Sequence, residues 1–440
     1  MKKLVLILLV LMCSLNFVGC QSEELPEASN AEDGSNAISG EITFSTWGSL
    51  EEKKVNEDII KLFEEKNPGV KVNLEYIPEE YTQRIDTMFL GKSAPDVIYG
   101  HPKYFAKWAS QGLLMDLTEK FNENPELLDD SKYRTNLYDA FTFNGQKIAT
   151  INGADTILLF YNKSMFDDAG IAYPNDDWTW DDFVAAATAL TKQDENGKTI
   201  QYGVSIDDGY SLEEVFTFSY GASWYDDMNL PTEVTFDSPE TIEGLQLMQD
   251  LIHKYKVAPS NSDKDILGGS FDSGKIAMDF SGVWAVVFRK DIEDFDWGLA
   301  NIPVPEGQDR KNPALYAGYA ISKTTENYDL SWEFAKFMQS DEAQKMLAAS
   351  GLITVINKDI ASSDEVIDIP GAPDNHMLRV TSLDYAVHND AMVTNWEETI
   401  TKVVTPNMQL LLDNKQDAAT TSKAIHDGLV RMLEEAETTK

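Results

Sequence analysis

The chain has 440 residues, a length that favours two or three domains. Hydrophobic residues make up 42% and charged residues 25%, which excludes a mostly disordered chain and a protein with many membrane spans. The 74 Asp and Glu against 36 Lys and Arg give a formal net charge of −38. The electric field of this negative charge repels nucleic acids and anionic lipids, so we expect no nucleic-acid partner. Neutral and cationic ligands remain compatible with the charge.

The first 19 residues are typical of a secretory signal peptide. Two lysines precede an apolar run that begins at Leu4 and is too short for a membrane span. The run ends in Gly19-Cys20, and a small residue before such a cysteine is typical of a bacterial lipoprotein. We therefore predict a signal peptide over residues 1–19 and lipidation of Cys20. The alternative is an ordinary signal peptide with an incidental cysteine.

Residues 20–40 are expected to form the lipidated cysteine and a flexible tether. Residues 21–40 are rich in Ser, Asn, Gly, Ala and acidic side chains, and they contain too few large apolar groups to form a core. Cys13 and Cys20 are the only cysteines, so the mature chain has neither a disulfide nor a zinc site built from cysteines. These features predict a folded body held by its lipid anchor on the outer face of the cell membrane.

The folded body begins with alternating strands and helices. Helices are recognised by apolar side chains that recur on one helical face, and strands by strict alternation or a short apolar run. The expected elements are a strand at 41–47, a helix at 51–65, a strand at 70–76, a helix at 81–89 and a strand at 94–98. This order predicts a parallel sheet with helices on both faces.

The same α/β pattern continues later in the chain. The continuous apolar run 157–161 predicts a buried strand. Thr179 with Asp182 three positions on is typical of a capping box, which begins a helix that runs to Leu190. Further helices are expected at 239–256, in two short segments within 328–350 that separate near Ser340, and at 416–436.

Most motifs of catalytic chemistry are missing from the sequence. None of the five histidines forms an H-x-x-x-H pair, and there is no G-x-S-x-G nucleophile motif. Carbohydrate sites instead combine flat aromatic platforms with carboxylates and amides. Trp47, Trp284 and Trp396 suit such platforms, although core packing is the alternative for any single tryptophan.

A set of short motifs carries a family resemblance. In chain order they are FEEKNPGVKV (63–72), APDV (94–97), QGLLMDL (111–117), YNKSMF (161–166), WTWDDF (178–183), FDSGKIAM (271–278), GVW (282–284), AGYAIS (317–322) and WEFAKF (332–337). Their order and spacing, from about residue 41 to residue 436, resemble the extracellular solute-binding protein family 1. These are the maltose-binding-protein-like sugar receptors of ABC importers.

The resemblance implies an α/β fold of the two-lobe periplasmic-binding-protein type, with discontinuous lobes, a hinge and a ligand cleft that closes by hinge motion. The expected first lobe comprises residues 41–155 plus 317–360. The expected second lobe comprises residues 156–316 plus 361–440.

The resemblance also implies a set of ligand-binding residues. Asp155, six positions before Tyr161, matches a carboxylate that binds sugar hydroxyls, and Trp284 matches a stacking aromatic of the second lobe. The full expected set is Trp47, His101, Asp155, Glu213, Trp224, Trp284, Tyr319 and Trp396.

The function implied is a membrane-anchored receptor that binds a carbohydrate, expected to be an oligosaccharide, and delivers it to the transmembrane subunits of an ABC permease. We expect a monomer with no catalytic residues, no cofactor and no metal site. The alternatives are an anchored glycoside hydrolase, a receptor of the same fold for a metal or another small solute, and an adhesion lipoprotein.

Overall fold

The computed structural model describes residues 38–206, 212–260, 263, 271–363, 366 and 369–438. The predicted signal peptide 1–19, Cys20 and residues 21–37 of the predicted tether lie outside the described residues, so these expectations stay predictions. Within the described ranges, no helix is both long and apolar enough to span a membrane.

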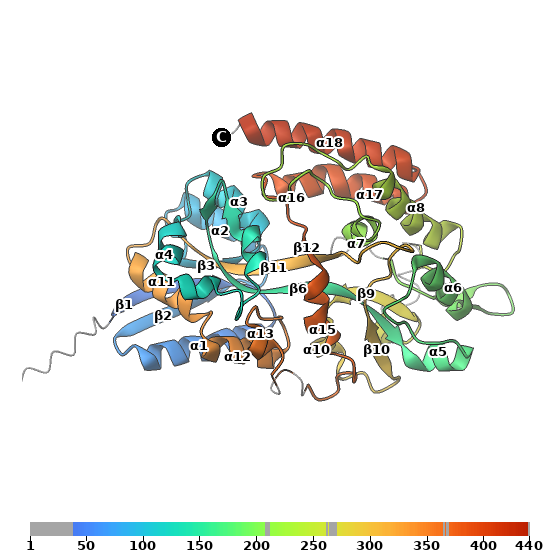
Figure 1. The fold of residues 1–440 in the computed structure, drawn as a ribbon, viewed down its shortest axis with the longest axis horizontal. Coiled ribbons are helices and arrows are strands. Elements are labelled where there is room, and N and C mark those ends of the chain that lie inside the picture. The colour runs from blue at the N-terminus through green and yellow to red at the C-terminus, as the bar shows by residue number, and fades with distance from the viewer. Residues whose placement is uncertain are drawn as a thin grey trace, which may run out of the picture. The chain divides into compact units, whose positions relative to one another are not determined.

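The strands and helices follow the predicted order (Figure 1). The strands are β1 (Gly40–Thr46), β2 (Val70–Tyr76), β3 (Val97–Gly100), β4 (Thr142–Phe143), β5 (Gln146–Lys147), β6 (Thr150–Asn162), β7 (Lys192–Gln193), β8 (Thr199–Gln201), β9 (Met278–Gly282), β10 (Trp297–Ala300), β11 (Asn312–Ile321) and β12 (Ala386–His388). The α-helices are α1 (Leu50–Lys66), α2 (Tyr81–Leu90), α3 (Pro102–Ser110), α4 (Thr118–Glu123), α5 (Lys163–Ala169), α6 (Trp180–Leu190), α7 (Leu212–Ser219), α8 (Pro239–His253), α10 (Ala285–Arg289), α11 (Tyr328–Phe337), α12 (Asp341–Ser350), α13 (Lys358–Ala361), α15 (Leu378–Thr381), α16 (Trp396–Thr399), α17 (Thr405–Leu412) and α18 (Ala418–Thr438). Short 3-10 helices lie at Pro125–Leu128, Thr135–Phe141, Phe271–Ser273 and Ser382–Tyr385, and a π-helical turn at Ile400–Val404 joins α16 to α17.

Local signals set several helix starts. At α6, the Thr179 side chain accepts a hydrogen bond from the Asp182 N–H while the Asp182 carboxylate accepts one from the Thr179 N–H, which confirms the predicted capping box. Ser340 caps α12 by accepting a hydrogen bond from the Ala343 N–H, so the predicted break within residues 328–350 is also confirmed.

One mixed sheet runs through the folded body in the order β10-β6-β11-β3-β1-β2. Strands β1, β2 and β3 pair in parallel, as predicted, with α1 and α12 on one side and α2 and α3 on the other (Figure 1). The long strands β6 and β11 pair antiparallel in the middle of the sheet, and β9 and β10 then pair with β6. The long strands therefore connect the two halves of the sheet.

Two large hydrophobic cores lie along this sheet. The first core contains, among others, Phe44, Phe63, Ile98, Phe105, Phe141, Trp332, Phe334, Val380 and Leu383. The second core contains, among others, Phe166, Phe183, Phe216, Trp224, Leu245, Trp396 and Leu429, and a smaller cluster around Phe160 and Leu299 lies beside it. Strand β6 passes from the first core at Ala154 to the second at Ile157. The α/β class is confirmed, whereas the residue bounds given above for the two lobes remain a prediction.

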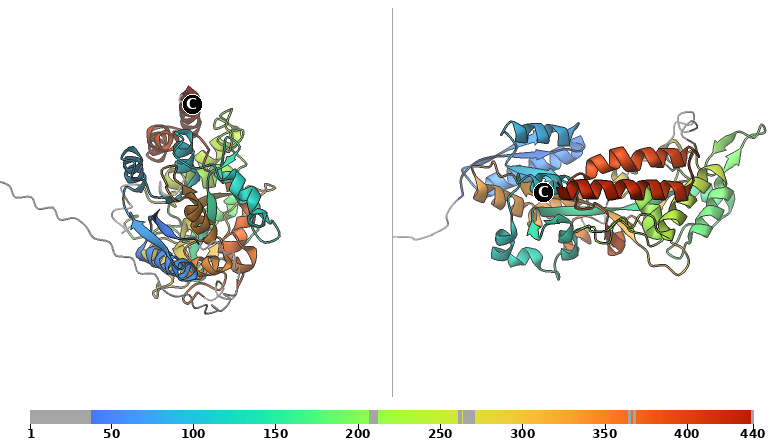
Figure 2. Two further views of the ribbon diagram at one scale, coloured as in Figure 1. Left: turned by 90° about the vertical axis from the view of Figure 1, so that its left-hand side faces the viewer. Right: turned by 90° about the horizontal axis from the view of Figure 1, so that it is seen from above.

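The C-terminal helices complete the second core. Helices α17 and α18 lie side by side and both contact α8 (Figures 1 and 2). The predicted helix at 416–436 is therefore confirmed as α18.

Candidate functional site

A cavity of about 420 Å³, called the cleft below, is lined by residues at β1, α1, β3 and α3, by strands β6 and β11, and by Trp284 and Phe288 at α10. This volume falls within the range of small-molecule binding sites. Four predicted residues line the cleft together: Trp47, His101, Asp155 and Trp284. The remaining lining residues are Ser49, Glu52, Tyr99, Lys103, Phe288, Leu315, Ala317, Leu352 and Ile353.

Trp47 follows the end of β1 and is held in a cluster of aromatic rings. Its ring centroid lies 4.5 Å from that of Tyr99, 4.7 Å from that of Tyr81 and 5.1 Å from that of His101. The next residue, Gly48, has a φ of 110°, a backbone conformation that glycine adopts without strain. The chain therefore turns into α1 directly behind a fixed indole ring.

His101 is the N-cap residue of α3, immediately after β3. Its Nδ1 is hydrogen-bonded to the backbone carbonyl of Tyr316, and because a carbonyl only accepts, Nδ1 must carry the proton. Burial, together with the nearby Lys103 ammonium, lowers the pKa of His101 to about 4. The imidazole is therefore neutral at pH 7.

Asp155 lies on β6 at the point where the strand passes between the cores. Its side chain is 6% exposed, and Oδ1 accepts a hydrogen bond of 2.9 Å from the Thr354 N–H. Burial raises the pKa of Asp155 to about 7, against the opposing effects of Thr354 and Arg379, and the neighbouring Glu52 contributes a further rise. The structure thus places a carboxyl group of unusually weak acidity in the wall of a cleft that also holds aromatic rings.

Trp284 lies on the other side of the cleft, at the N-terminus of α10. A methyl group built on Gly282 would meet the Trp284 ring at 2.1 Å, so only glycine lets the indole lie across the end of β9. Phe288 follows one helical turn later and is 55% exposed at the same cleft. The glycine of the Gly-x-Trp motif is therefore required in this chain because any larger residue would collide with the tryptophan ring.

Replacing Gly282 with alanine is expected to displace the Trp284 ring and to lower the free energy of unfolding by about 1–3 kcal/mol, because the added methyl group overpacks the site. The measurement is urea-induced unfolding followed by tryptophan fluorescence. Gly91→Ala is the control, since a methyl group there meets only ordinary contacts at 3.5 Å and its φ of −78° suits any residue. Equal stability of the two variants would contradict the steric role of Gly282.

Nine lining residues lie outside the predicted set, and local signals point to three of them. Glu52 also serves the capping box of α1, where its Oε2 accepts a hydrogen bond of 2.6 Å from the Ser49 N–H, which hides a second role. Tyr99 is near the carboxyl end of β3, where ligands of open α/β sheets commonly bind. Phe288 is four positions after Trp284, which is same-face spacing on a helix.

The other four predicted residues lie outside the lining of the cleft. Tyr319, in β11, is buried with its ring centroid 5.6 Å from that of Tyr99. Trp224 and Trp396 are buried in the second core and pack against each other with centroids 5.3 Å apart. Glu213 is buried in α7. The assignment of these four residues to ligand binding stays a prediction.

A second cavity of about 470 Å³ lies between α3, α16 and the end of α18, and Trp396 contributes to its lining. Lys103 lines both this cavity and the cleft. Its Nζ lies 3.4 Å from Oδ1 of Asp390, which follows β12. Burial alone would lower the pKa of Lys103, but Asp390 and the other acidic groups nearby outweigh it and raise the pKa. A charged pair therefore links the start of α3 to the segment before the C-terminal helices.

In the ranges that the structure describes, no three His, Cys, Asp or Glu side chains come together in a way that could ligate a transition metal. The cleft offers indole and phenol rings, two carboxyl groups, an ammonium group and a neutral imidazole. These groups suit stacking and hydrogen bonding to a polar organic ligand.

The chain is similar in sequence to known proteins over most of its length. The profile of the family described as bacterial extracellular solute-binding protein matches residues 47–345. The multiple sugar-binding protein of Streptococcus mutans is 22% identical over 347 residues, covering 75% of this chain and 79% of that protein.

Solved structures share the whole fold. An ABC substrate-binding protein of Listeria monocytogenes, solved in complex with cycloalternan, is 26% identical, with a TM-score of 0.77, and the match covers 90% of this chain and 100% of that chain. UgpB from Mycobacterium tuberculosis, in complex with glycerophosphocholine, is 18% identical, with a TM-score of 0.75 over 90% of this chain and 100% of that chain. The predicted two-lobe binding-protein fold is confirmed, and the chain belongs to the bacterial extracellular solute-binding protein family.

Proposed function

We propose that this protein is an extracytoplasmic receptor that captures a carbohydrate, expected to be an oligosaccharide, in the cleft. One observation carries the proposal: Trp47 and Trp284 come from different halves of the fold and line the same cavity as the Asp155 carboxyl group. Indole rings stack on the apolar C–H faces of a sugar ring, while a carboxylate accepts hydrogen bonds from the hydroxyl groups at its rim.

The names of related proteins support the ligand class. The relative from Streptococcus mutans is named as a multiple sugar-binding protein, and the structure from Listeria monocytogenes is a complex with cycloalternan. His101 is neutral at pH 7, so it can form hydrogen bonds to a ligand without the free-energy cost of removing water from a charged group. This property suits a neutral ligand.

Capture is proposed to serve an ABC importer. Closure of the two lobes about the crossing strands would enclose the sugar and form the surface that the permease recognises. We further propose that Cys20 is lipidated, that residues 21–40 tether the body to the outer face of the cell membrane, and that the protein acts as a monomer. No covalent step is proposed, because the relatives are binding proteins and stacking with hydrogen bonding is sufficient for capture and release.

The decisive experiment is a thermal-shift screen against monosaccharides, oligosaccharides, metal ions and amino acids, followed by calorimetric titration of each hit. A ligand at 100 times its dissociation constant adds about 2.7 kcal/mol to stability, which moves the midpoint by several degrees. A shift with one class of carbohydrate would support the proposal. A shift with a metal ion or amino acid and with no carbohydrate would overturn it, and release of reducing sugar on long incubation would favour a hydrolase.

A further inference from the structure

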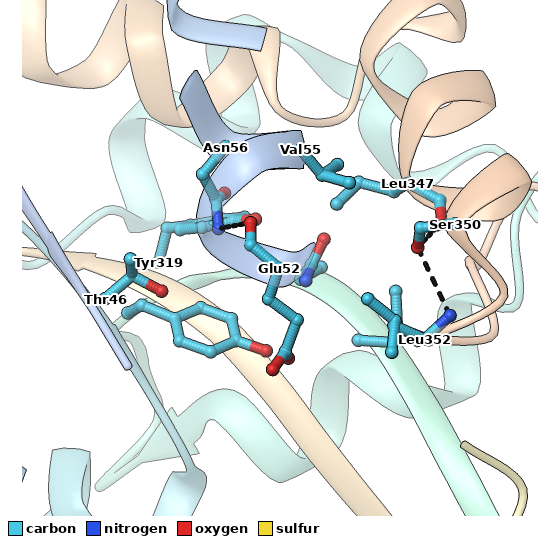
Figure 3. A pocket seen from close by; sticks show the side chains of 11 residues that line it. Thr46, Glu52, Val55, Asn56, Tyr319, Leu347, Ser350 and Leu352 are labelled. Atoms are coloured by element: carbon cyan, nitrogen blue, oxygen red, sulfur yellow. Dashed lines mark hydrogen bonds between the residues drawn. The ribbon is translucent and has the colours of Figure 1, made fainter. Parts of the chain in front are cut away.

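A small cavity adjoins the cleft, and it is called the chamber below (Figure 3). Its volume is about 20 Å³, enough for one occupant of the size of a water molecule. The chamber and the cleft adjoin, because four residues line both: Glu52, Tyr99, Leu352 and Ile353. Val55, Leu347 and Leu352 close the chamber with apolar side chains (Figure 3).

The polar groups of the chamber include an oxygen atom that lacks a protein partner. Asn152 is 3% exposed, and its side-chain Oδ1 accepts no hydrogen bond from the protein. A buried polar atom without a partner costs free energy, so native proteins rarely leave one unsatisfied. Tyr99, Tyr319 and Asn56 add further oxygen-bearing side chains to the same lining. The Asn152 Oδ1 atom is therefore available to bind an occupant of the chamber.

The charge of Glu52 is also uncompensated in the protein. Within the described part of the chain, no positively charged side chain is among the groups that shift the pKa of Glu52. Burial raises the pKa of Glu52, the hydrogen bond from Ser49 partly opposes this rise, and the adjacent Glu51 carboxylate adds to it. Bringing a carboxylate into this site without a counter-charge is unfavourable.

We propose that the chamber binds one alkali metal cation, Na⁺ or K⁺, through the Glu52 carboxylate and the Asn152 Oδ1 atom. A cation satisfies both groups at once, since each presents only oxygen lone pairs, whereas a neutral water molecule leaves the carboxylate charge uncompensated. Carboxylate, amide and hydroxyl oxygens are ligands of hard cations. The single carboxylate favours a monovalent ion over Ca²⁺, which usually takes several acidic ligands.

The test is thermal unfolding of the full-length protein, without sugar, in NaCl, KCl or choline chloride at one constant ionic strength. Choline is too large for a chamber of about 20 Å³, so it supplies the same screening without entering. The expected result is a saturable rise of the midpoint, by roughly 2 °C or more, with Na⁺ or K⁺ replacing choline. The better of the two ions identifies the cation that the chamber prefers.

Two variants place the effect in the chamber. Glu52→Gln keeps the shape of the side chain and the capping box, because glutamine also accepts from the Ser49 N–H, but it removes the charge. Asn152→Leu removes the amide oxygen and leaves α1 untouched. Both should abolish the difference between Na⁺ or K⁺ and choline, while Glu51→Gln, on the adjacent exposed residue, should preserve it.

Identical midpoints in all three salts would overturn the proposal and leave water as the occupant. A cation effect that persists in both Glu52→Gln and Asn152→Leu would overturn the location. Crystals soaked in thallium(I), a heavy monovalent cation, give an independent test that needs no variant. An anomalous peak in contact with Asn152 Oδ1 supports the site, and the absence of any peak in the chamber overturns it.

Discussion

Replacing Trp284 with alanine should weaken carbohydrate binding by about 2–3 kcal/mol, or roughly 30- to 150-fold, because buried aromatic anchors contribute most of the affinity of a binding site. The indole is half-buried at the cleft and follows a glycine that makes room for it. Its loss removes one of the two stacking platforms while the other, Trp47, remains. Calorimetric titration with the sugar found in the screen measures the change.

Trp178→Ala is the matched control for this substitution. Trp178 is also half-buried and packs beside the second core, with its ring centroid 6.2 Å from that of Phe166, but it does not line the cleft. It should lose some stability and keep its affinity. Unchanged affinity of Trp284→Ala, or an equal loss in both variants, would contradict the proposed stacking role.

Replacing Asp155 with asparagine should stabilise the unliganded protein at pH 8 and weaken sugar binding. Asparagine still accepts the hydrogen bond from the Thr354 N–H, but it carries no charge into the buried site. The rise in the pKa of Asp155 from 3.8 to about 7 corresponds to about 4 kcal/mol, which is the upper bound of the expected gain. A ligand hydroxyl loses a charged acceptor, so affinity should fall about tenfold or more.

The pH dependence of stability should change in the same variant. The folded protein holds the Asp155 proton up to about pH 7, whereas the unfolded chain releases it near pH 3.8. Between these values the folded state binds more protons than the unfolded state, so the free energy of unfolding falls as the pH rises. The destabilisation caused by Asp155 is therefore absent below about pH 4 and reaches its full size above about pH 7. The difference in unfolding free energy between Asp155→Asn and the parent should therefore grow across this window.

Urea unfolding at several pH values from 4 to 8 checks this expectation. Asp309→Asn is the control, because its side chain is exposed and surface substitutions rarely change stability by more than about 0.5 kcal/mol. A constant difference between Asp155→Asn and the parent at every pH would show that the buried carboxyl group does not titrate as described. Higher stability together with lower affinity would identify Asp155 as a residue kept for binding at a cost to the fold.

Local patterns predicted most of the regular elements. The capping residues Ser340 and Thr179 act within their own chain segments, and the apolar periodicity of α1 and α18 needs no knowledge of distant residues. The short strands β4, β5, β7 and β8, of two or three residues each, and the π-helical turn before α17 carry no comparable signal. They form because neighbouring segments hold the backbone in place.

The candidate site was only partly accessible to the same reasoning. Trp47 and Trp284 line the cleft, whereas Trp224 and Trp396 pack against each other in the second core. All four are aromatic residues beside turns or element ends, so sequence cannot separate a stacking platform from core packing. The position of Glu52 in the lining of the cleft could not be predicted for a related reason. A glutamate at this position is already explained by the capping box of α1, so the sequence gives no sign of a further role.

The sequence by itself determined the family and the α/β class and predicted a signal peptide. These features depend on composition, local periodicity and the order of short motifs. Only the tertiary structure decided that Asp155 sits at the passage between the cores with a weakened acidity, and that Glu52 and Asn152 share one chamber. The physical reason is that burial and charge compensation depend on atoms contributed by distant segments. A carboxyl group acquires its pKa, and an amide oxygen loses its partner, only when those segments pack.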